Sequence, residues 1–450
     1  MNDNRNMILA VVLSALVLLG WGMLSDYFLP PTAAPQTQKV EDGKVKPIPQ
    51  PEAGPVTQSP GRLRARERVL AEAPRVQIRT PSLRGSINLK GARIDDLVLL
   101  RERQTIAKDS QPVRLLSPAG APDANFISFG WTGEGLNVPG PDTEWSASAQ
   151  VLEPGHPVTL TAANGSGQRF AMQISVDENY LFTVRQQVAN GGSGPVAVRP
   201  YGLINRAGKS RDPDSWTMHV GPIGYLDGAA NYDNDWDSLE NGQSKRVESR
   251  GGWLGFTDTY WLTALAPAGN PAITASFSGT PSGGFQADFA ATPAIVPPGG
   301  SSSIATRVFV GAKEKALLDR YEEAGIPMLS KSIDWGWFEW FMRPIFDLLN
   351  WLFKVTGNFG VAIIALTFIV RLIMFPLGQK QFKSMAAMRK VQPKIKALQE
   401  RFKDDRQRQQ QEMLKLYKDE KINPAAGCLP ILLQIPIFYA LYKVLMVSVE

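Results

Sequence analysis

One apolar stretch in the second half of the chain limits what the sequence can fold into. Residues 359–377 read FGVAIIALTFIVRLIMFPL and contain a single charged residue, Arg371. A run of this length and hydropathy can cross the hydrocarbon core of a bilayer, which is roughly 30 Å thick. The sequence therefore predicts a transmembrane helix over residues 358–377 with a permanently charged guanidinium inside it.

Two other apolar runs lie near the ends of the sequence. Residues 7–24 are 18 consecutive uncharged residues, so we expect an N-terminal transmembrane anchor over residues 1–29. A cleaved signal peptide is the alternative, but Trp21 and the aromatic pair after the run are typical of an interfacial anchor. Residues 427–448 are predicted to form a further span.

The region between the first two spans divides into a linker and a large domain. Residues 30–60 contain eight prolines and lack apolar periodicity, so a disordered tether is expected. Residues 61–325 contain many short alternating segments, such as RFAMQISV and LFTVRQQV, separated by turn residues. This pattern predicts a large antiparallel β-sandwich. Because the chain has one cysteine, no disulfide framework holds that domain together.

An aromatic-rich segment, residues 333–355, precedes the predicted span at 358–377 and holds four of the chain's 11 tryptophans. Its polar residues recur at intervals of 4, 4, 3 and 4, which places them on one helical face: Glu339, Arg343, Asp347, Asn350 and Lys354. The spacing predicts an amphipathic interfacial helix at the depth of the lipid headgroups. A helix docked on the soluble domain is the alternative.

Positive charge is concentrated between the last two predicted spans. Residues 379–421 contain 13 Lys or Arg and 6 Asp or Glu, a local net charge of +7, whereas the whole chain carries +6. Apolar spacing predicts a helical hairpin over residues 378–424, with a break between its two helices at Asp404 and Asp405. The positive-inside rule places the hairpin in the cytoplasm. Two alternatives remain: a topological signal that contacts lipid headgroups, and binding to ribosomal phosphate. The β-domain then lies outside.

The arginine in the 358–377 span has polar neighbours. Thr367 lies one helical turn before Arg371, and the 427–448 span contributes Gln434. Intramembrane polar groups gather where water or partners satisfy them, which favours a hydrated groove over a side chain that only snorkels to the headgroups. Neither span contains an acidic residue, so the groove would be positively charged.

Little in the sequence points to an enzyme. The chain has two histidines and neither a GxSxG nor an HExxH motif, and Asp95 with Asp96 is expected to be solvated charge rather than a catalytic pair. No cofactor or metal site is predicted. The alternative function that the residues leave open is a membrane-anchored periplasmic binding or scaffold protein.

The segment NFGVAIIALTFIVRLIMFPL, followed by the basic stretch and GCLPILLQIPIFYALYKVL, closely resembles the YidC family of membrane protein insertases, in its Gram-negative form. In the β-domain the best matching stretch is GGWLGFTDTYWLTALAP. The resemblance implies an α+β membrane protein of the bacterial inner membrane: an anchor, a periplasmic β-supersandwich, an interfacial helix and a helical membrane core with a cytoplasmic hairpin.

The resemblance also implies roles for individual residues. Arg371 would be the groove arginine, with Thr367 and Gln434 in its polar lining. The hairpin would contact substrates or the ribosome through Met385, Met388, Arg389, Lys390 and Lys394. Implied partners are nascent membrane proteins, the Sec translocon, ribosomes and membrane lipids, with no DNA. The family core continues with three more spans after Val447, so a sequence ending at Glu450 is expected to be truncated and inactive as it stands.

Overall fold

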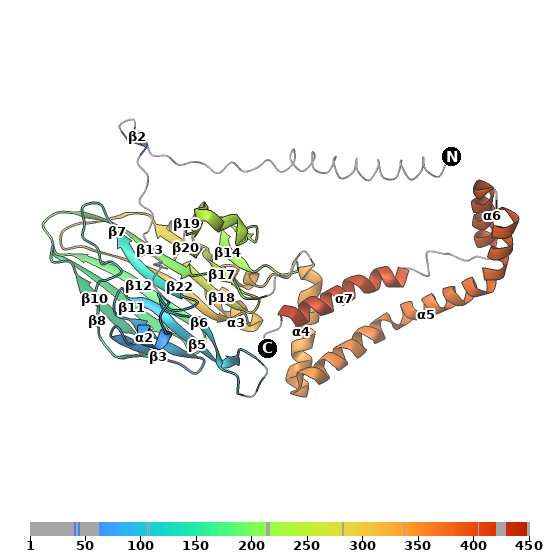
Figure 1. The fold of residues 1–450 in the computed structure, drawn as a ribbon, viewed down its shortest axis with the longest axis horizontal. Helices are drawn as coiled ribbons and strands as arrows, with labels where there is room; N and C mark the ends of the chain where they lie inside the picture. Colours follow the sequence, from blue (N-terminus) through green and yellow to red (C-terminus); the bar gives the residue numbers. More distant parts are fainter. Residues whose placement is uncertain are drawn as a thin grey trace. The chain divides into compact units, whose positions relative to one another are not determined.

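The computed structural model describes residues 40–41, 44–45, 63–105, 107, 109–212, 217–280, 283–336, 338–403, 405–419 and 429–447 (Figure 1). Two compact units divide the chain, Met1–Gln50 and Pro51–Glu450. The predicted anchor over residues 1–29 lies outside the described residues. Within the predicted tether, β1 (Val40–Glu41) pairs with β2 (Lys44–Val45) in antiparallel fashion.

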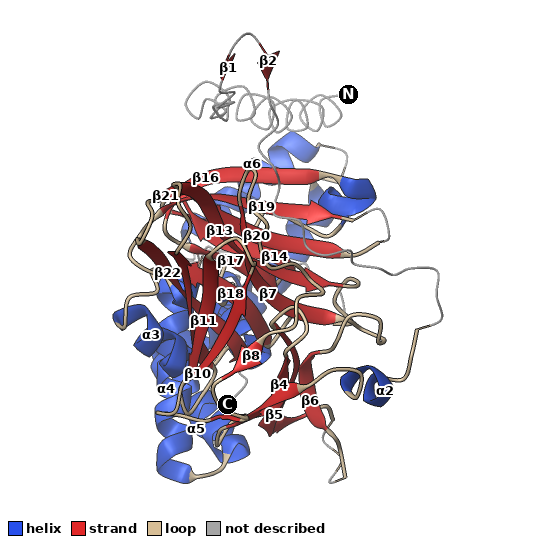
Figure 2. Cartoon of the chain, turned by 90° about the vertical axis from the view of Figure 1, so that its left-hand side faces the viewer, coloured by secondary structure: helices blue, strands red, loops and turns tan. Residues whose placement is uncertain are grey.

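Most of the second unit is β-structure, drawn red in Figure 2, in two large sheets. One described sheet has nine strands in the order β15 (Ala229–Asn231), β14 (Gly221–Leu226), β17 (Trp253–Thr257), β18 (Trp261–Pro267), β22 (Ser301–Ala312), β12 (Leu181–Asn190), β11 (Gln168–Val176), β10 (Val158–Ala163) and β8 (Ser146–Ala147).

The other sheet has eleven described strands. Its main path runs β16 (Ser244–Arg250), β19 (Ala272–Gly279), β20 (Phe285–Ala291), β13 (Val196–Arg206), β7 (Asn125–Thr132), β5 (Arg93–Arg103), β4 (Leu83–Asn88), β3 (Arg75–Arg79) and β9 (Val151–Leu152), while β21 (Ala294–Val296) pairs with β13 and β6 (Pro112–Leu116) pairs with β5. The predicted β-sandwich is confirmed, and the one parallel pair among its described strands is β3 with β9.

Alternation of apolar and polar residues explains why these segments are strands. In β11, Phe170, Met172 and Ile174 are fully buried, whereas the intervening residues are exposed or half-buried. Buried residues from both sheets belong to one hydrophobic core, so each sheet hides its apolar face against the other. That core forms without any disulfide.

A glycine pair sets the junction between β16 and β17. Gly251 and Gly252 have φ values of +63° and +87°, which L side chains rarely adopt. A Cβ atom on Gly252 would also collide with the carbonyl oxygen of Tyr225 on β14. Glycine at position 252 is therefore required both for the backbone conformation and for the close approach of β14 to β17.

The expectation that Asp95 and Asp96 are solvated is wrong for Asp95. Both residues lie in β5, where the register against β4 shifts between Ser86 and Ile87. Asp95 is only 1% exposed and forms an ion pair with Arg75, and its burial raises the pKa of its carboxyl group above the usual range. The sequence could not reveal this burial, because a bulge turns a residue without changing the local composition.

Helices complete the described chain: α2 (Arg66–Leu70), η1 (Asp237–Gly242), α3 (Lys315–Glu323), η2 (Leu329–Ser332), α4 (Glu339–Thr356), α5 (Phe359–Arg401), α6 (Arg406–Asp419) and α7 (Leu429–Val447). The side chain of Asn358 caps α5 by accepting a hydrogen bond from the backbone N–H of Val361 at 3.1 Å. α5 continues through Pro376 and Pro393, so the predicted span and the first hairpin helix form one helix of 43 residues.

α4 corresponds to the predicted amphipathic helix. Its contacts bear on two interpretations, an interfacial helix at the membrane and a helix docked on the β-domain. Met342 and Leu349 are buried, and the helix packs against α5 and α7. Glu339 pairs with Lys331 of η2 and Asp347 pairs with Lys315 of α3 at 3.1 Å, as a helix docked on the β-domain would do. Trp340 and Trp351 remain exposed, as membrane contact requires, so an interfacial position remains a prediction.

Candidate functional site

Among the described helices, only α5 is long and apolar enough to cross a membrane, over Phe359–Pro376. Just 11% of that window is buried inside the protein, as expected for a helix that lipid surrounds. The apolar helix found in α7 is shorter, Gln434–Val447. The structure thus supports the span that contains Arg371 and leaves the other two predicted spans as predictions.

The two faces of α5 differ. Ala362 and Leu366, one turn apart, are buried where α5 packs against α4 and α7. At 100° per residue, Arg371 lies about 140° around the helix from Leu366. Thr367 and Arg371 are both exposed, among apolar side chains that are also exposed: Val361, Ile364, Phe368, Leu372 and Phe375.

Arg371 and Thr367 share this exposed face. Within the described part of the chain, no hydrogen bond or ion pair holds the guanidinium of Arg371. The hydroxyl of Thr367 donates to the carbonyl oxygen of Ile363 at 2.8 Å, which leaves its lone pairs free to accept from an N–H group. The pair therefore offers a cation and an acceptor, one turn apart, to a polar guest.

Gln434 is not brought to this pair by the described contacts. It is half-buried on α7, and no described hydrogen bond joins it to Thr367 or Arg371. α7 instead packs mainly through Ile437, Ala440 and Val444. Of the three predicted lining residues, Thr367 and Arg371 lie one turn apart on α5 and Gln434 lies on α7, and their role in a groove remains a prediction.

The predicted hairpin corresponds to the second half of α5 together with α6. Arg389, Lys390 and Lys394 are exposed, whereas the side chains of Met385 and Met388 lie outside the described structure. The predicted break at residues 404–405 is present, because α5 ends at Arg401 and α6 begins at Arg406. A group of exposed cations such as this one favours contact with an anionic surface.

A buried ionic cluster near the C-terminal end of α7 was missed by the sequence analysis. Lys443 is fully buried, donates a hydrogen bond to the carbonyl oxygen of Thr217, and lies 3.8 Å from a carboxylate oxygen of Asp334. The same carboxylate oxygen accepts the backbone N–H of His219 at 3.0 Å. A lysine inside an apolar run was the available signal, since a buried amine needs a partner.

A second buried lysine lies near this cluster. Lys313 donates a hydrogen bond to the hydroxyl of Thr257 at 2.9 Å, and burial lowers its pKa to about 8. Lys313 contacts Thr257 of β17 and lies close to Asp334, which in turn pairs with Lys443 of α7. The two lysines are buried and held by contacts between the β-domain and the C-terminal segments, so the cluster is best interpreted as a structural junction.

A large β-sandwich joined to an amphipathic helix, an apolar helix and a basic hairpin defines a membrane protein with a large extramembrane domain. Two family models match the chain, the YidC periplasmic domain over residues 75–348 and the 60Kd inner membrane protein over residues 351–450. Relatives that match over the whole of this chain point to the same family.

The Membrane protein insertase YidC of Zymomonas mobilis is 44% identical over 100% of this chain and 77% of its own length. The YidC of Ruegeria pomeroyi is 42% identical over 100% of this chain and 77% of its own length. This chain belongs to the YidC family of membrane protein insertases. As predicted, its relatives are insertases rather than enzymes, and its β-domain is the family's periplasmic domain in an inner membrane protein.

Solved structures also match. An active YidC insertase crystal structure is 21% identical with a TM-score of 0.30, covering 84% of this chain and 72% of that chain. A galactose mutarotase related enzyme from Lactobacillus acidophilus is 11% identical with a TM-score of 0.37, covering 52% of this chain and 97% of that chain.

Proposed function

We propose that this chain inserts membrane proteins by receiving their hydrophilic segments at a hydrated, positively charged groove that Arg371, Thr367 and Gln434 line. One observation carries the proposal: the guanidinium of Arg371 is exposed on an apolar helix face and has no anionic partner in the described part of the chain. Such a cation is available to a passing acidic or polar segment.

The depth of Arg371 supports a groove that is open toward the cytoplasm. Counting from Phe359, Arg371 lies roughly 18 Å along the helix and about 9 Å from Leu377. An arginine at a helix centre costs about 2.5–3.5 kcal/mol on insertion scales. Water in a groove would lower that cost, and a polar guest would replace the water without exposing charge to hydrocarbon.

The mechanism needs no covalent step. A hydrophilic tail enters the groove and is held by the charge of Arg371, and its hydrophobic segment moves into lipid, where burial of apolar surface drives release. The membrane potential assists an acidic tail, by about 2.3 kcal/mol per charge and 100 mV. The barrier is lowered because the polar segment crosses only the part of the bilayer that lies beyond the groove.

The proposed topology is multi-pass. The N-terminal anchor at 1–29, the span at 358–377 and the span at 427–448 would place the hairpin in the cytoplasm, as its net positive charge favours. In that position the exposed residues Arg389, Lys390 and Lys394 can meet ribosomal phosphate or anionic lipid headgroups. Nascent membrane proteins are the proposed substrates, with the Sec translocon as a partner for some of them.

Replacement of Arg371 tests the groove. Each variant is made in a full-length version that carries the further spans expected from the family, and insertion of a single-span substrate with an acidic tail is measured in cells depleted of their own insertase. Arg371→Ala should slow insertion about tenfold or more, since one charge-assisted interaction contributes about 1.5–3 kcal/mol. Arg371→Lys should restore most of the rate, because the charge matters more than the fork geometry.

The matched control is Lys354→Ala, which removes one exposed cation from the end of α4 and should leave insertion unchanged. Thr367→Val should have a smaller effect than Arg371→Ala, because it removes an acceptor but no charge. Full insertion by Arg371→Ala at a normal protein level would refute the proposed groove.

A further inference from the structure

The β-domain contains a cleft of about 920 Å³ that insertion at Arg371 does not use. Strands β4, β5 and β6 line one part of it, and residues 206–212 line another. A space of this size holds a ligand larger than a single ion or small metabolite. The cleft thus raises the question of what the periplasmic domain binds.

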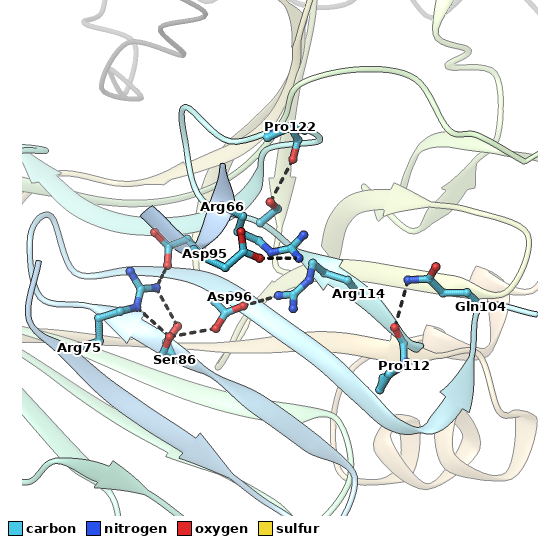
Figure 3. A network of polar contacts seen from close by, with 11 residues as sticks. Arg66, Arg75, Ser86, Asp95, Asp96, Gln104, Pro112, Arg114 and Pro122 are labelled. Carbon is cyan, nitrogen blue, oxygen red and sulfur yellow. Dashed lines mark hydrogen bonds and ion pairs between the residues drawn. The ribbon is translucent and has the colours of Figure 1, made fainter. Parts of the chain in front are cut away.

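A polar network fixes the residues along one side of the cleft (Figure 3). Arg75 forms an ion pair with Asp95 and donates to the hydroxyl of Ser86 at 2.8 Å. Ser86 in turn donates to Asp96 at 3.1 Å, and Asp96 pairs with Arg114 of β6. Four neighbouring strands are tied by these contacts, so the cleft wall is preformed rather than assembled on binding.

Positive charge exceeds negative charge among the residues that line the cleft. Six cations and four carboxylates give it a net charge of +2: Arg66, Arg84, Arg114, Arg206, Lys209 and Arg211, with Asp96, Asp123, Asp212 and Asp258. Arg206 is neutralised by Asp258 through two hydrogen bonds of 2.9 and 2.8 Å. Four of the other lining cations are also paired: Arg66 with Glu67, Arg114 with Asp96, Lys209 with Asp237 and Glu240, and Arg211 with Asp123. These pairs leave one lining cation without a described carboxylate partner.

Arg84 is the unneutralised cation. It is exposed, and no hydrogen bond or ion pair holds its guanidinium within the described residues. Arg79 of β3, also exposed, lies directly opposite Arg84 in the β3–β4 register. Like charges directly opposite on neighbouring strands are destabilising. An anionic group bound between these two arginines would remove that repulsion.

The neighbouring strand β6 limits how a ligand can bind. Among the described strands, β6 pairs with β5 alone, and side chains partly cap its carbonyl groups. Asn125 donates to the carbonyl oxygen of Leu115 at 2.7 Å, and Gln104 donates to that of Pro112 at 3.2 Å. Recognition through side chains is consequently favoured over addition of a further β-strand.

We propose that this cleft binds acidic stretches of polypeptide segments that have been delivered to the periplasm. Segments that cross the membrane are poor in Lys and Arg, so their charged residues are mainly acidic. Apolar side chains, Val98, Val113 and Leu115, line the same cleft and suit a peptide in which acidic and apolar residues alternate. The inference rests on the proposed insertase function, because that function supplies such segments.

Binding of labelled decapeptides to the whole protein in detergent tests the inference by fluorescence anisotropy. The probes are a peptide of alternating Glu and Val, the same peptide with Gln for Glu, and an acidic oligosaccharide. The Glu peptide should bind more tightly than the Gln peptide. The double variant R79Q/R84Q should weaken binding of the Glu peptide about tenfold, as expected for two charge-assisted contacts at a partly open site.

The matched control is R169Q/R185Q, which removes two exposed arginines from the neighbouring strands β11 and β12 of the other sheet. It changes the net charge equally and should leave binding unchanged. The inference would be overturned if the Glu and Gln peptides bound with equal affinity, or if both double variants weakened binding equally. It would also be overturned if only the oligosaccharide bound.

Failure of this inference and failure of the proposed groove give different results. If the cleft does not bind acidic peptide but Arg371→Ala still blocks insertion, only the cleft assignment is wrong. If Arg371→Ala inserts normally while R79Q/R84Q loses peptide binding, the groove is wrong and the cleft assignment remains.

Discussion

Asp288 on β20 provides a quantitative test of the packing of the β-domain. Its side chain is 5% exposed and accepts one hydrogen bond, from the amide of Gln286 at 2.7 Å. Burial raises the pKa of Asp288 from its usual 3.8 to about 6, although the hydrogen bond from Gln286 and nearby arginines act in the opposite direction. The charged form is therefore disfavoured in the folded protein.

The raised pKa fixes the sign of the pH dependence. Between about pH 4 and pH 6 the folded state binds a proton that the unfolded state lacks, so the free energy of unfolding falls as pH rises through this window. Above pH 6 the carboxyl group is ionised in both states, so the folded protein bears the full free-energy cost of the buried charge. A shift of about two pKa units corresponds to about 3 kcal/mol, with each unit contributing about 1.4 kcal/mol.

Asp288→Asn replaces the carboxyl group by a neutral group of the same shape. The variant should be more stable than the natural protein by about 2–3 kcal/mol at pH 7.5 and equally stable at pH 4. For a domain of this size, the melting temperature should rise by about 5–10 °C at pH 7.5. Tryptophan fluorescence during thermal unfolding in detergent, at pH 4 to 8, measures both quantities.

Asp109→Asn, at an exposed position, is the control and should change the melting temperature at neither pH. A gain from Asp288→Asn that is the same at pH 4 and pH 7.5 would show that its cause is not the carboxylate charge. A loss of stability at pH 7.5 would show that Asp288 is a favourable buried anion, and the reasoning from desolvation would be refuted.

Two further predictions concern the junctions of the fold. Lys443→Met should destabilise the packing of α7 on the β-domain by about 3 kcal/mol, because Asp334 loses a buried cation. A melting temperature equal to that of Lys443→Arg would contradict this prediction. Gly252→Ala should destabilise the β-domain by more than about 2 kcal/mol in denaturant unfolding. Gly228 has a similar φ of +78° but open space around it, so Gly228→Ala should have a smaller effect. Equal losses of stability would exclude a role for the close approach of β14.

The elements of the fold were predictable where a local pattern is strong. Alternation in β11 predicted a strand, and the apolar run from Phe359 predicted the helix that the structure describes. Asp404 and Asp405 predicted the break between α5 and α6. These signals depend on neighbours in sequence, which is why they are visible without the fold.

The candidate site was predictable in part for the same reason. Thr367 and Arg371 are four residues apart on one helix, so helical geometry alone places them on one face. Gln434 belongs to another helix, and its distance from Arg371 depends on how α5 and α7 pack. The lysine cluster was missed because Asp334 and Thr217 are far from Lys443 in the sequence.

The sequence by itself determined the β-sandwich, the apolar helix with its single arginine, and the basic hairpin, because hydrophobic period and charge are properties of the order of residues. Only the tertiary structure decided the burial of Asp95, Asp288 and Lys443 and the preformed cleft beside β6. These features arise from side chains of distant strands and helices that share one space, and desolvation and pairing there depend on packing rather than on sequence spacing.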